Sequence, residues 1–146
     1  MACYQHILVT SDLTPNSEKL ALKTKELADK LGAQLSIVHV VEHSPMVYGS
    51  GEFAIPLDLE LEESLEKEAK ERLQRLSEAL GINQASRWLL IGSRKEEIVQ
   101  LAEKINSDLV VVGAHDRHGL GLLFGSTADS ILRALPCDIL SIRVDE

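Results

Sequence analysis

Aromatic residues, cysteines and basic side chains are all scarce in this chain of 146 residues. Phe, Trp and Tyr make up 3% of it, and no apolar run approaches the roughly 18 residues that a membrane-spanning helix needs. The 15 Lys and Arg are outnumbered by 23 Asp and Glu, so the formal net charge is -8. Negative charge opposes binding to phosphate backbones and to anionic lipid headgroups. We therefore expect no nucleic acid and no membrane among the partners.

The cysteine content and the first residues predict a protein of the cytoplasm. Cys3 and Cys137 are the only cysteines, and their spacing matches no zinc or redox motif. A reducing compartment keeps such thiols reduced. The segment from Met1 to His6 has neither a basic leader nor a long apolar stretch. With 45% apolar residues, residues 1–146 are expected to form a single domain around one core.

Short apolar runs of β type alternate along the chain with longer stretches of helical periodicity. Strands are predicted at 6–10, 34–41, 86–91, 108–112 and 138–144, and helices at 15–31, 57–80, around 98–105 and at 126–135. This alternation predicts an α/β fold, a doubly wound five-stranded parallel sheet with helices on both faces. The nearly continuous apolar run at 108–112 is expected at the centre of the sheet, and the looser last strand at an edge.

The helix predicted at 57–80 combines one apolar stripe with many charges. The stripe consists of Leu61, Leu65, Ala69, Leu73, Leu76 and Leu80. Four acid–base pairs are spaced four residues apart with the acid first, namely Glu63–Lys67, Glu66–Lys70, Glu68–Arg72 and Glu71–Arg75. Each such pair stabilises a helix by roughly a few tenths of a kcal/mol. We interpret the charged face as solvated surface.

Three segments are expected to meet where a ligand would bind. Ligands of doubly wound sheets lie beyond the carboxyl ends of the strands, where the strand order reverses. Asp12 follows the first strand, Val40 ends the second, and the loop 113–127 follows the fourth. Asp12 either accepts hydrogen bonds from ribose hydroxyls or only shapes the turn before Thr14, and the sequence leaves both alternatives open.

The loop 113–127 has the composition of an anion site. It contains glycines at 113, 119, 121 and 125 and leads through Ser126 and Thr127 into the last predicted helix. Free backbone amides and two hydroxyls at the positive end of a helix favour a bound anion.

Three segments of the chain resemble the universal stress protein family. They are His6–Thr14, Ser36–Glu42 and Asp108–Thr127, and the likeness extends over nearly the whole chain. The resemblance implies a Rossmann-like fold similar to the adenine nucleotide alpha hydrolases, a homodimer and a role in the stress response. One branch of the family binds ATP, with Mg²⁺, through the motif Gly-x-x-Gly, a nine-residue spacer and Gly-Ser/Thr.

Carried onto this chain, the resemblance assigns a role to each candidate site residue. Gly113 is the first glycine of the motif, and Gly125 and Ser126 are its closing pair, followed by Thr127. Asp12 would be the ribose partner and Val40 the residue that lines the adenine.

Two departures from the ATP motif set up an alternative function. Asp116 replaces the second glycine, and eight residues separate it from Gly125. A carboxylate about 4 Å from a phosphate costs several kcal/mol at a dielectric of about 20, although Mg²⁺ or the nearby Arg117 and His118 would compensate. Members similar to the A-type branch lack the motif and bind no nucleotide. The alternative is therefore a dimeric stress-response interaction protein with a vestigial, nucleotide-free cradle.

Catalytic and metal sites are not expected. His115 and His118 invite a general-base interpretation, but no nucleophile or orienting acid accompanies them at a recognisable spacing. Together with Asp116 they offer three metal ligands without a matching distal set. We predict a binding module and not an enzyme, with slow nucleotide hydrolysis left open.

The last strand is the predicted dimer seam. An apolar strand at the edge of a sheet presents unpaired backbone groups, which invite antiparallel pairing with the same strand of a second copy. This seam would make the protein a homodimer.

Overall fold

The computed structural model describes residues 3–42, 59–114 and 133–144. In chain order the elements are β1 (His6–Thr10), α1 (Pro15–Leu31), β2 (Gln34–Val41), α2 (Leu59–Ala79), the 3-10 helix η2 (Gln84–Ser86), β3 (Arg87–Ile91), α3 (Arg94–Lys104), β4 (Leu109–Ala114) and β5 (Asp138–Arg143). The predicted alternation of strands and helices is confirmed for these elements. Most of the helix predicted at 126–135 lies outside the described residues.

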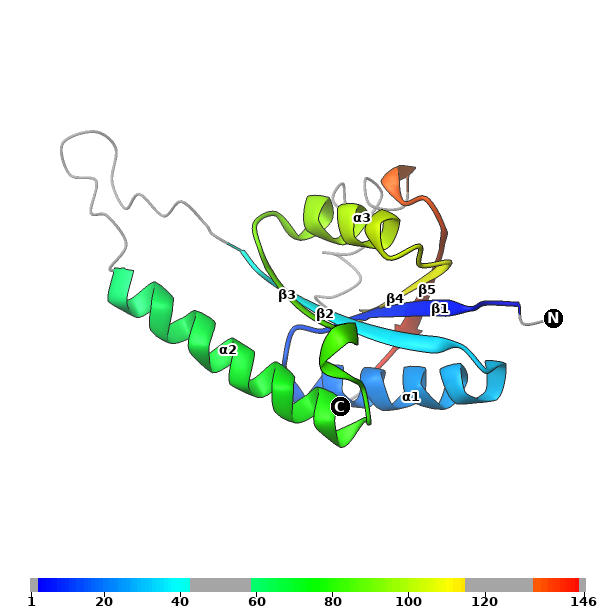
Figure 1. Cartoon of the computed structure of the whole chain (residues 1–146), viewed down its shortest axis with the longest axis horizontal. Helices are drawn as coiled ribbons and strands as arrows, with labels where there is room; N and C mark the ends of the chain where they lie inside the picture. The colour runs from blue at the N-terminus through cyan, green and yellow to red at the C-terminus, as the bar shows by residue number, and fades with distance from the viewer. Residues whose placement is uncertain (1–2, 43–58, 115–132, 145–146) are drawn as a thin grey trace.

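All five strands are parallel and lie in the order β3-β2-β1-β4-β5. Figure 1 shows α1 and α2 on one face of this sheet and α3 on the other. The predicted doubly wound α/β fold is confirmed, and β5 is an edge strand as expected. The prediction that β4 lies at the centre was wrong, because the chain returns after β3 to the other side of β1 and leaves β1 in the middle. An apolar run on both faces requires only an inner strand, and β4 is one.

The sheet separates two apolar clusters. The cluster on the side of α1 and α2 is built from Ile7, Val9, Leu20, Ala21, Ala28, Leu35, Ile37, Leu73, Leu80, Ile82, Leu109, Val111 and Val144. The cluster on the side of α3 is built from Leu8, Val38, Val40, Ile98, Leu101, Ala102, Val110 and Val112. Alternate residues of β1 therefore enter different clusters, as the period of two along a strand requires.

The ends of α1 follow from local sequence signals. Thr14 is the N-cap and accepts a hydrogen bond from the backbone N–H of Ser17 at 3.3 Å, and Pro15 occupies the first turn. Gly32 ends the helix in the left-handed conformation, with φ of 66°, which glycine adopts without a steric penalty. This helix begins beside the carboxyl end of β1 and so fixes where the chain leaves the sheet.

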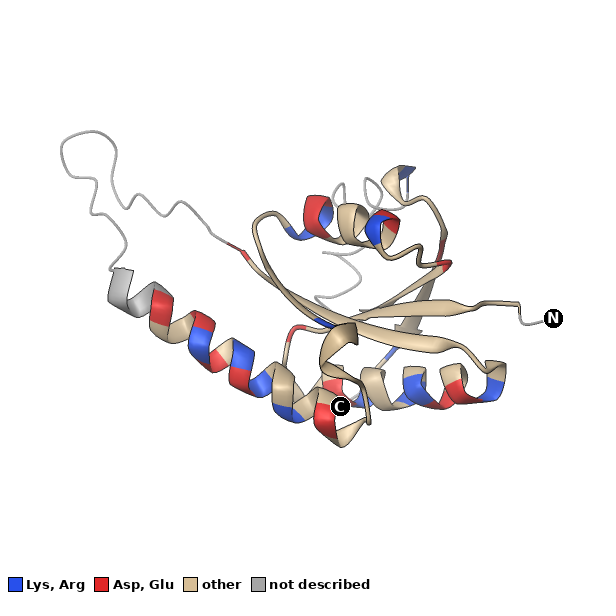
Figure 2. Ribbon diagram, in the orientation of Figure 1, with Lys and Arg blue, Asp and Glu red and all other residues tan. Residues whose placement is uncertain are grey.

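Only the second half of α2 packs on the sheet. Leu73 and Leu80 are 1% and 5% exposed, whereas Leu65 of the same apolar stripe is 52% exposed. Figure 1 shows why: the first half of α2 extends past the edge of the sheet. Its surface is highly charged (Figure 2), and Glu68 and Arg72 form the predicted ion pair at 3.0 Å. Within the described ranges, no helix has the length and apolar character needed to cross a membrane.

Candidate functional site

Asp12, Val40 and Gly113 come together at the carboxyl edge of the sheet, where the strand order reverses between β1 and β4. The backbone N–H of Ser11 donates to the carbonyl of Val38 at 2.9 Å, which extends the β1–β2 ladder beyond β1. If the register of β1 with β2 is continued, Asp12 lies level with Val40 of β2. If the register of β1 with β4 is continued, Asp12 lies close to the level of Gly113 of β4. The predicted convergence of the first two segments with the start of the third is thus observed.

The Asp12 carboxylate organises the start of α1. Its Oδ1 accepts hydrogen bonds from the backbone N–H of Thr14 at 3.0 Å and from the Thr14 hydroxyl at 2.6 Å. The interpretation that Asp12 shapes this turn is therefore correct. The Asp12 side chain is exposed.

The loop between β1 and α1 is held by its own side chains. The buried Ser17 hydroxyl donates to the Thr14 carbonyl at 2.8 Å, so the Ser11 hydroxyl must donate to Ser17 Oγ, 3.0 Å away. Ser11 Oγ in turn accepts from the backbone N–H of Leu13 at 3.1 Å. Leu13 has φ of 63°, a left-handed conformation that costs a non-glycine residue about 1–2 kcal/mol. Strain of this kind concentrates at functional sites.

His39 ties β2 to this loop. Its Nδ1 lies 2.7 Å from the Ser11 carbonyl oxygen. Because a carbonyl only accepts hydrogen bonds, Nδ1 must carry the proton. The sequence analysis missed this contact. The available signal was a lone histidine in the otherwise apolar segment Ile37–Val41 at the carboxyl end of a strand.

Val40 and Gly113 lie next to the ends of their strands at this edge, and their side-chain positions face opposite sides of the sheet. Val40 is buried in the cluster on the α3 side. Gly113 is within β4, and a Cβ at this position would lie 3.1 Å from Leu20 Cδ2. A larger side chain would therefore press on α1. The Leu20 side chain would have to shift by a few tenths of an ångström to admit even a methyl group at this position.

The rest of the predicted site lies outside the described residues. This holds for Arg117, Gly125, Ser126 and Thr127. It holds also for His115, Asp116 and His118, the three metal ligands that the sequence offers. Among the residues that the structure describes, no three metal-ligating side chains converge.

The two thiols lie away from this edge of the sheet. Cys3 and Cys137 are both free, Cys3 before β1 and Cys137 before β5. Burial raises the pKa of the Cys137 thiol, and the carboxylates of Asp138 and Asp108 act in the same direction. A raised pKa means less thiolate at neutral pH, and the thiolate is the reactive form.

Comparison with known proteins gives one consistent result. The sequence model described as the Universal stress protein family matches residues 3–143. Universal stress protein A homolog 1 of Coxiella burnetii is 42% identical over 143 residues, which cover 98% of this chain and 99% of that protein. The crystal structure of UspA from Lactobacillus plantarum has a TM-score of 0.72 at 24% identity and covers 98% of this chain and 100% of its own. A universal stress protein in complex with cAMP has a TM-score of 0.59 at 22% identity, with 95% and 96% covered.

Proposed function

The chain belongs to the universal stress protein family, and from this premise we propose that it is a stress-response module that binds ATP or a related adenine nucleotide. The observation that carries the proposal is the alignment of Asp12, Val40 and Gly113 at the reversal of strand order. This is the position at which doubly wound sheets bind nucleotides. A solved universal stress protein of the same fold is a complex with cAMP, which supports an adenine nucleotide as the ligand class.

The described residues fit the adenine and ribose of such a nucleotide. The exposed Asp12 carboxylate can accept further hydrogen bonds from ribose hydroxyls while it caps the turn. Val40 supplies apolar surface at the level of Asp12, as an adenine ring requires.

The phosphate half of the proposal comes from the sequence. Backbone amides at Gly125, Ser126 and Thr127 would hold the phosphates, with Arg117 or Mg²⁺ offsetting the negative charge of Asp116. The proposal contains binding and no chemical step. Incubation of the purified protein with ATP should therefore return the ATP intact.

Co-purification and thermal unfolding test nucleotide binding. Acid extraction of the purified protein should release adenine nucleotide. Saturation with Mg-ATP at about 100 times its dissociation constant should add about 2.7 kcal/mol to the free energy of unfolding, or about 5 to 10 °C in Tm for a domain of this size. Differential scanning calorimetry with and without Mg-ATP measures the shift.

Two aspartate variants locate the ligand. Asp12→Ala should lose most of the Mg-ATP shift. Asp29→Ala should keep it, because Asp29 lies on α1 and pairs with Lys25 at the surface. The control removes the same charge at the opposite end of α1. Equal shifts in both variants would show that Asp12 does not contact the ligand.

Asp116 favours a second candidate function, a dimeric interaction protein with an empty cradle. A carboxylate at the second glycine position of the motif opposes phosphate binding. No extracted nucleotide and no Mg-ATP shift in the wild-type protein would remove the first proposal and leave this alternative.

We also propose that the protein is a homodimer paired through β5. Within the residues that the structure describes, β5 pairs with β4 alone, and Leu140 on it is 36% exposed. Such an edge favours pairing with its own copy. The seam is at the opposite edge of the sheet from β3.

A further inference from the structure

The peptide groups of Ser11 are held by β2 on both sides. Its N–H donates to the Val38 carbonyl at 2.9 Å, and its carbonyl accepts from Nδ1 of His39 at 2.7 Å. In a regular parallel ladder both partners would be backbone groups. Here a side chain supplies the second contact, directly after β1 ends at Thr10. The position of Ser11 therefore depends on which residue stands at position 39.

His39 reaches the loop from the face of the sheet that carries α1 and α2. Neighbouring residues of a strand point to opposite faces. Ile37 belongs to the cluster on the side of α1 and α2, whereas Val38 and Val40 belong to the cluster on the side of α3. His39 therefore shares the face of Ile37. Val40, which is proposed to line the adenine, projects to the other face.

Ser11 supports a strained residue in the loop. Leu13 has φ of 63°, and a conformation of this kind persists only where the surrounding contacts determine it. The backbone N–H of Leu13 donates to Ser11 Oγ at 3.1 Å, and Ser11 Oγ lies 3.0 Å from Ser17 Oγ on α1. Ser11 is 8% exposed, so water offers little replacement for these contacts. A shift of Ser11 would release Leu13.

Asp12 lies between Ser11 and Leu13 in the chain. Its Oδ1 accepts from the backbone N–H of Thr14 at 3.0 Å, so the direction of the carboxylate follows the backbone of residues 11–14. The hydrogen bond from His39 therefore acts on Asp12 through Ser11.

We propose that His39 is a positioning residue for the nucleotide site. Its Nδ1–H holds the Ser11 carbonyl and keeps the loop between β1 and α1 in the conformation that places Asp12 at the reversal of strand order. The inference rests on the proposed nucleotide binding, and it assigns His39 no contact with the ligand. A protein whose loop adopts the binding conformation only part of the time has an apparent affinity reduced by that fraction. Loss of the Nδ1–H should therefore weaken nucleotide binding without removing a ligand contact.

Two substitutions at position 39 separate the hydrogen bond from the ring. In His39→Asn the side-chain Nδ2 is joined to Cα through Cβ and Cγ, as Nδ1 of histidine is, so the amide can donate to the Ser11 carbonyl. His39→Leu has a branch of the same length that cannot donate. Isothermal titration with Mg-ATP should give about tenfold weaker binding for His39→Leu, and a loss of less than about threefold for His39→Asn.

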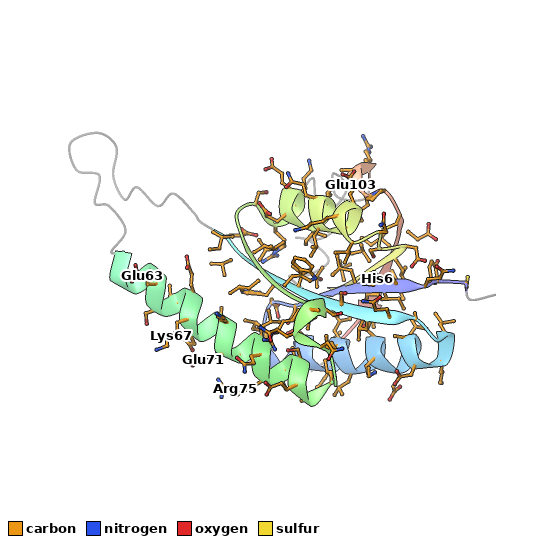
Figure 3. All side chains as sticks on the ribbon, in the orientation of Figure 1. His6, Glu63, Lys67, Glu71, Arg75 and Glu103 are labelled. Atoms are coloured by element: carbon orange, nitrogen blue, oxygen red, sulfur yellow. The ribbon has the colours of Figure 1, made fainter. Side chains whose placement is uncertain are left out.

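His6 provides a matched control, because it lies at the start of β1, at the opposite end of the β1–β2 pair (Figure 3). Its Nδ1 lies 3.0 Å from the Ile105 carbonyl oxygen, so His6→Leu removes the same kind of contact away from the loop. Thermal unfolding should show a loss of stability in both leucine variants. Only His39→Leu should lose affinity for Mg-ATP.

Amide hydrogen exchange without ligand measures the order of the loop itself. The N–H groups of Ser11 and Leu13 should exchange about tenfold faster in His39→Leu than in wild type or in His39→Asn. The N–H of Gln34 should not change, because it donates to the Gln5 carbonyl at 2.9 Å at the other end of the same strand pair. Heteronuclear NMR of the wild-type protein should show the neutral His39 ring protonated at Nδ1.

The outcomes separate this inference from the function on which it rests. If wild type binds no Mg-ATP, the proposed function fails, and exchange at Ser11 and Leu13 still decides whether His39 holds the loop. Where wild type binds, the positioning role is overturned by unchanged affinity in His39→Leu, by an equal loss in His39→Asn, or by an equal loss in His6→Leu. A neutral His39 ring protonated at Nε2 alone would also overturn it.

Discussion

Replacement of Asp116 by Gly is expected to tighten Mg-ATP binding by about tenfold or more, with about a thousandfold as the upper bound. One unit charge 4 Å from another is worth about 4 kcal/mol at a dielectric of about 20, and each 1.4 kcal/mol is about tenfold in affinity. Mg²⁺ and Arg117 neutralise part of the repulsion, which is why the smaller value is the expected one. Isothermal titration of wild type and Asp116→Gly with Mg-ATP measures the difference.

A second substitution separates charge from backbone freedom. Asp116→Asn removes the charge and keeps the size of the side chain and its backbone preferences. If repulsion is the cause, Asn recovers most of the gain seen with Gly. The gain should also shrink at high ionic strength, because salt screens charges at an exposed site. Unchanged or weaker affinity in both variants would show that the carboxylate does not repel phosphate.

The fold was predictable because its signals are local. The alternation of apolar periodicities defined the strands, and β2 was predicted at its observed bounds, 34–41. Thr14, Pro15 and Gly32 marked the ends of α1 because each performs its role within one turn of the helix. Strand order depends on contacts between distant segments, which the local signals do not report. The prediction therefore placed β4 at the centre of the sheet, where the structure has β1.

Contacts between distant segments of the site were not predictable. The hydrogen bond from His39 to the Ser11 carbonyl joins residues 28 apart in sequence, and the close approach of Gly113 to Leu20 joins β4 to α1. A sequence shows which residue types are present but not which strands bring them together. Asp12 illustrates this limit: the sequence offered two roles, and the coordinates add the two hydrogen bonds to Thr14 that hold it in place.

The extension of α2 past the sheet could not be predicted from the periodicity of its apolar residues. The apolar stripe continues without a break from Leu65 to Leu80, so nothing in the sequence distinguishes its two halves. Periodicity reports which side of a helix is apolar, and it does not report how far the sheet extends beneath that side. Leu65 is accordingly 52% exposed, whereas Leu80 of the same stripe is 5% exposed.

Replacement of Leu140 by Pro is expected to abolish the β5 seam and to yield monomer or aggregate. Proline lacks the N–H that a paired strand donates, and its ring disfavours a paired position. Both copies carry the change across a two-fold seam, so two backbone hydrogen bonds of about 1 kcal/mol each are lost, which should weaken the dimer more than about tenfold. Ile142→Pro, two residues along the same strand, should act in the same way. Light scattering after size exclusion measures the mass.

Leu140→Thr is the matched control for this seam. Threonine removes apolar area but keeps the backbone N–H and suits a strand, so the dimer should survive if backbone pairing holds it. A Leu140→Pro protein that keeps the mass of a dimer would show that the seam does not lie on β5.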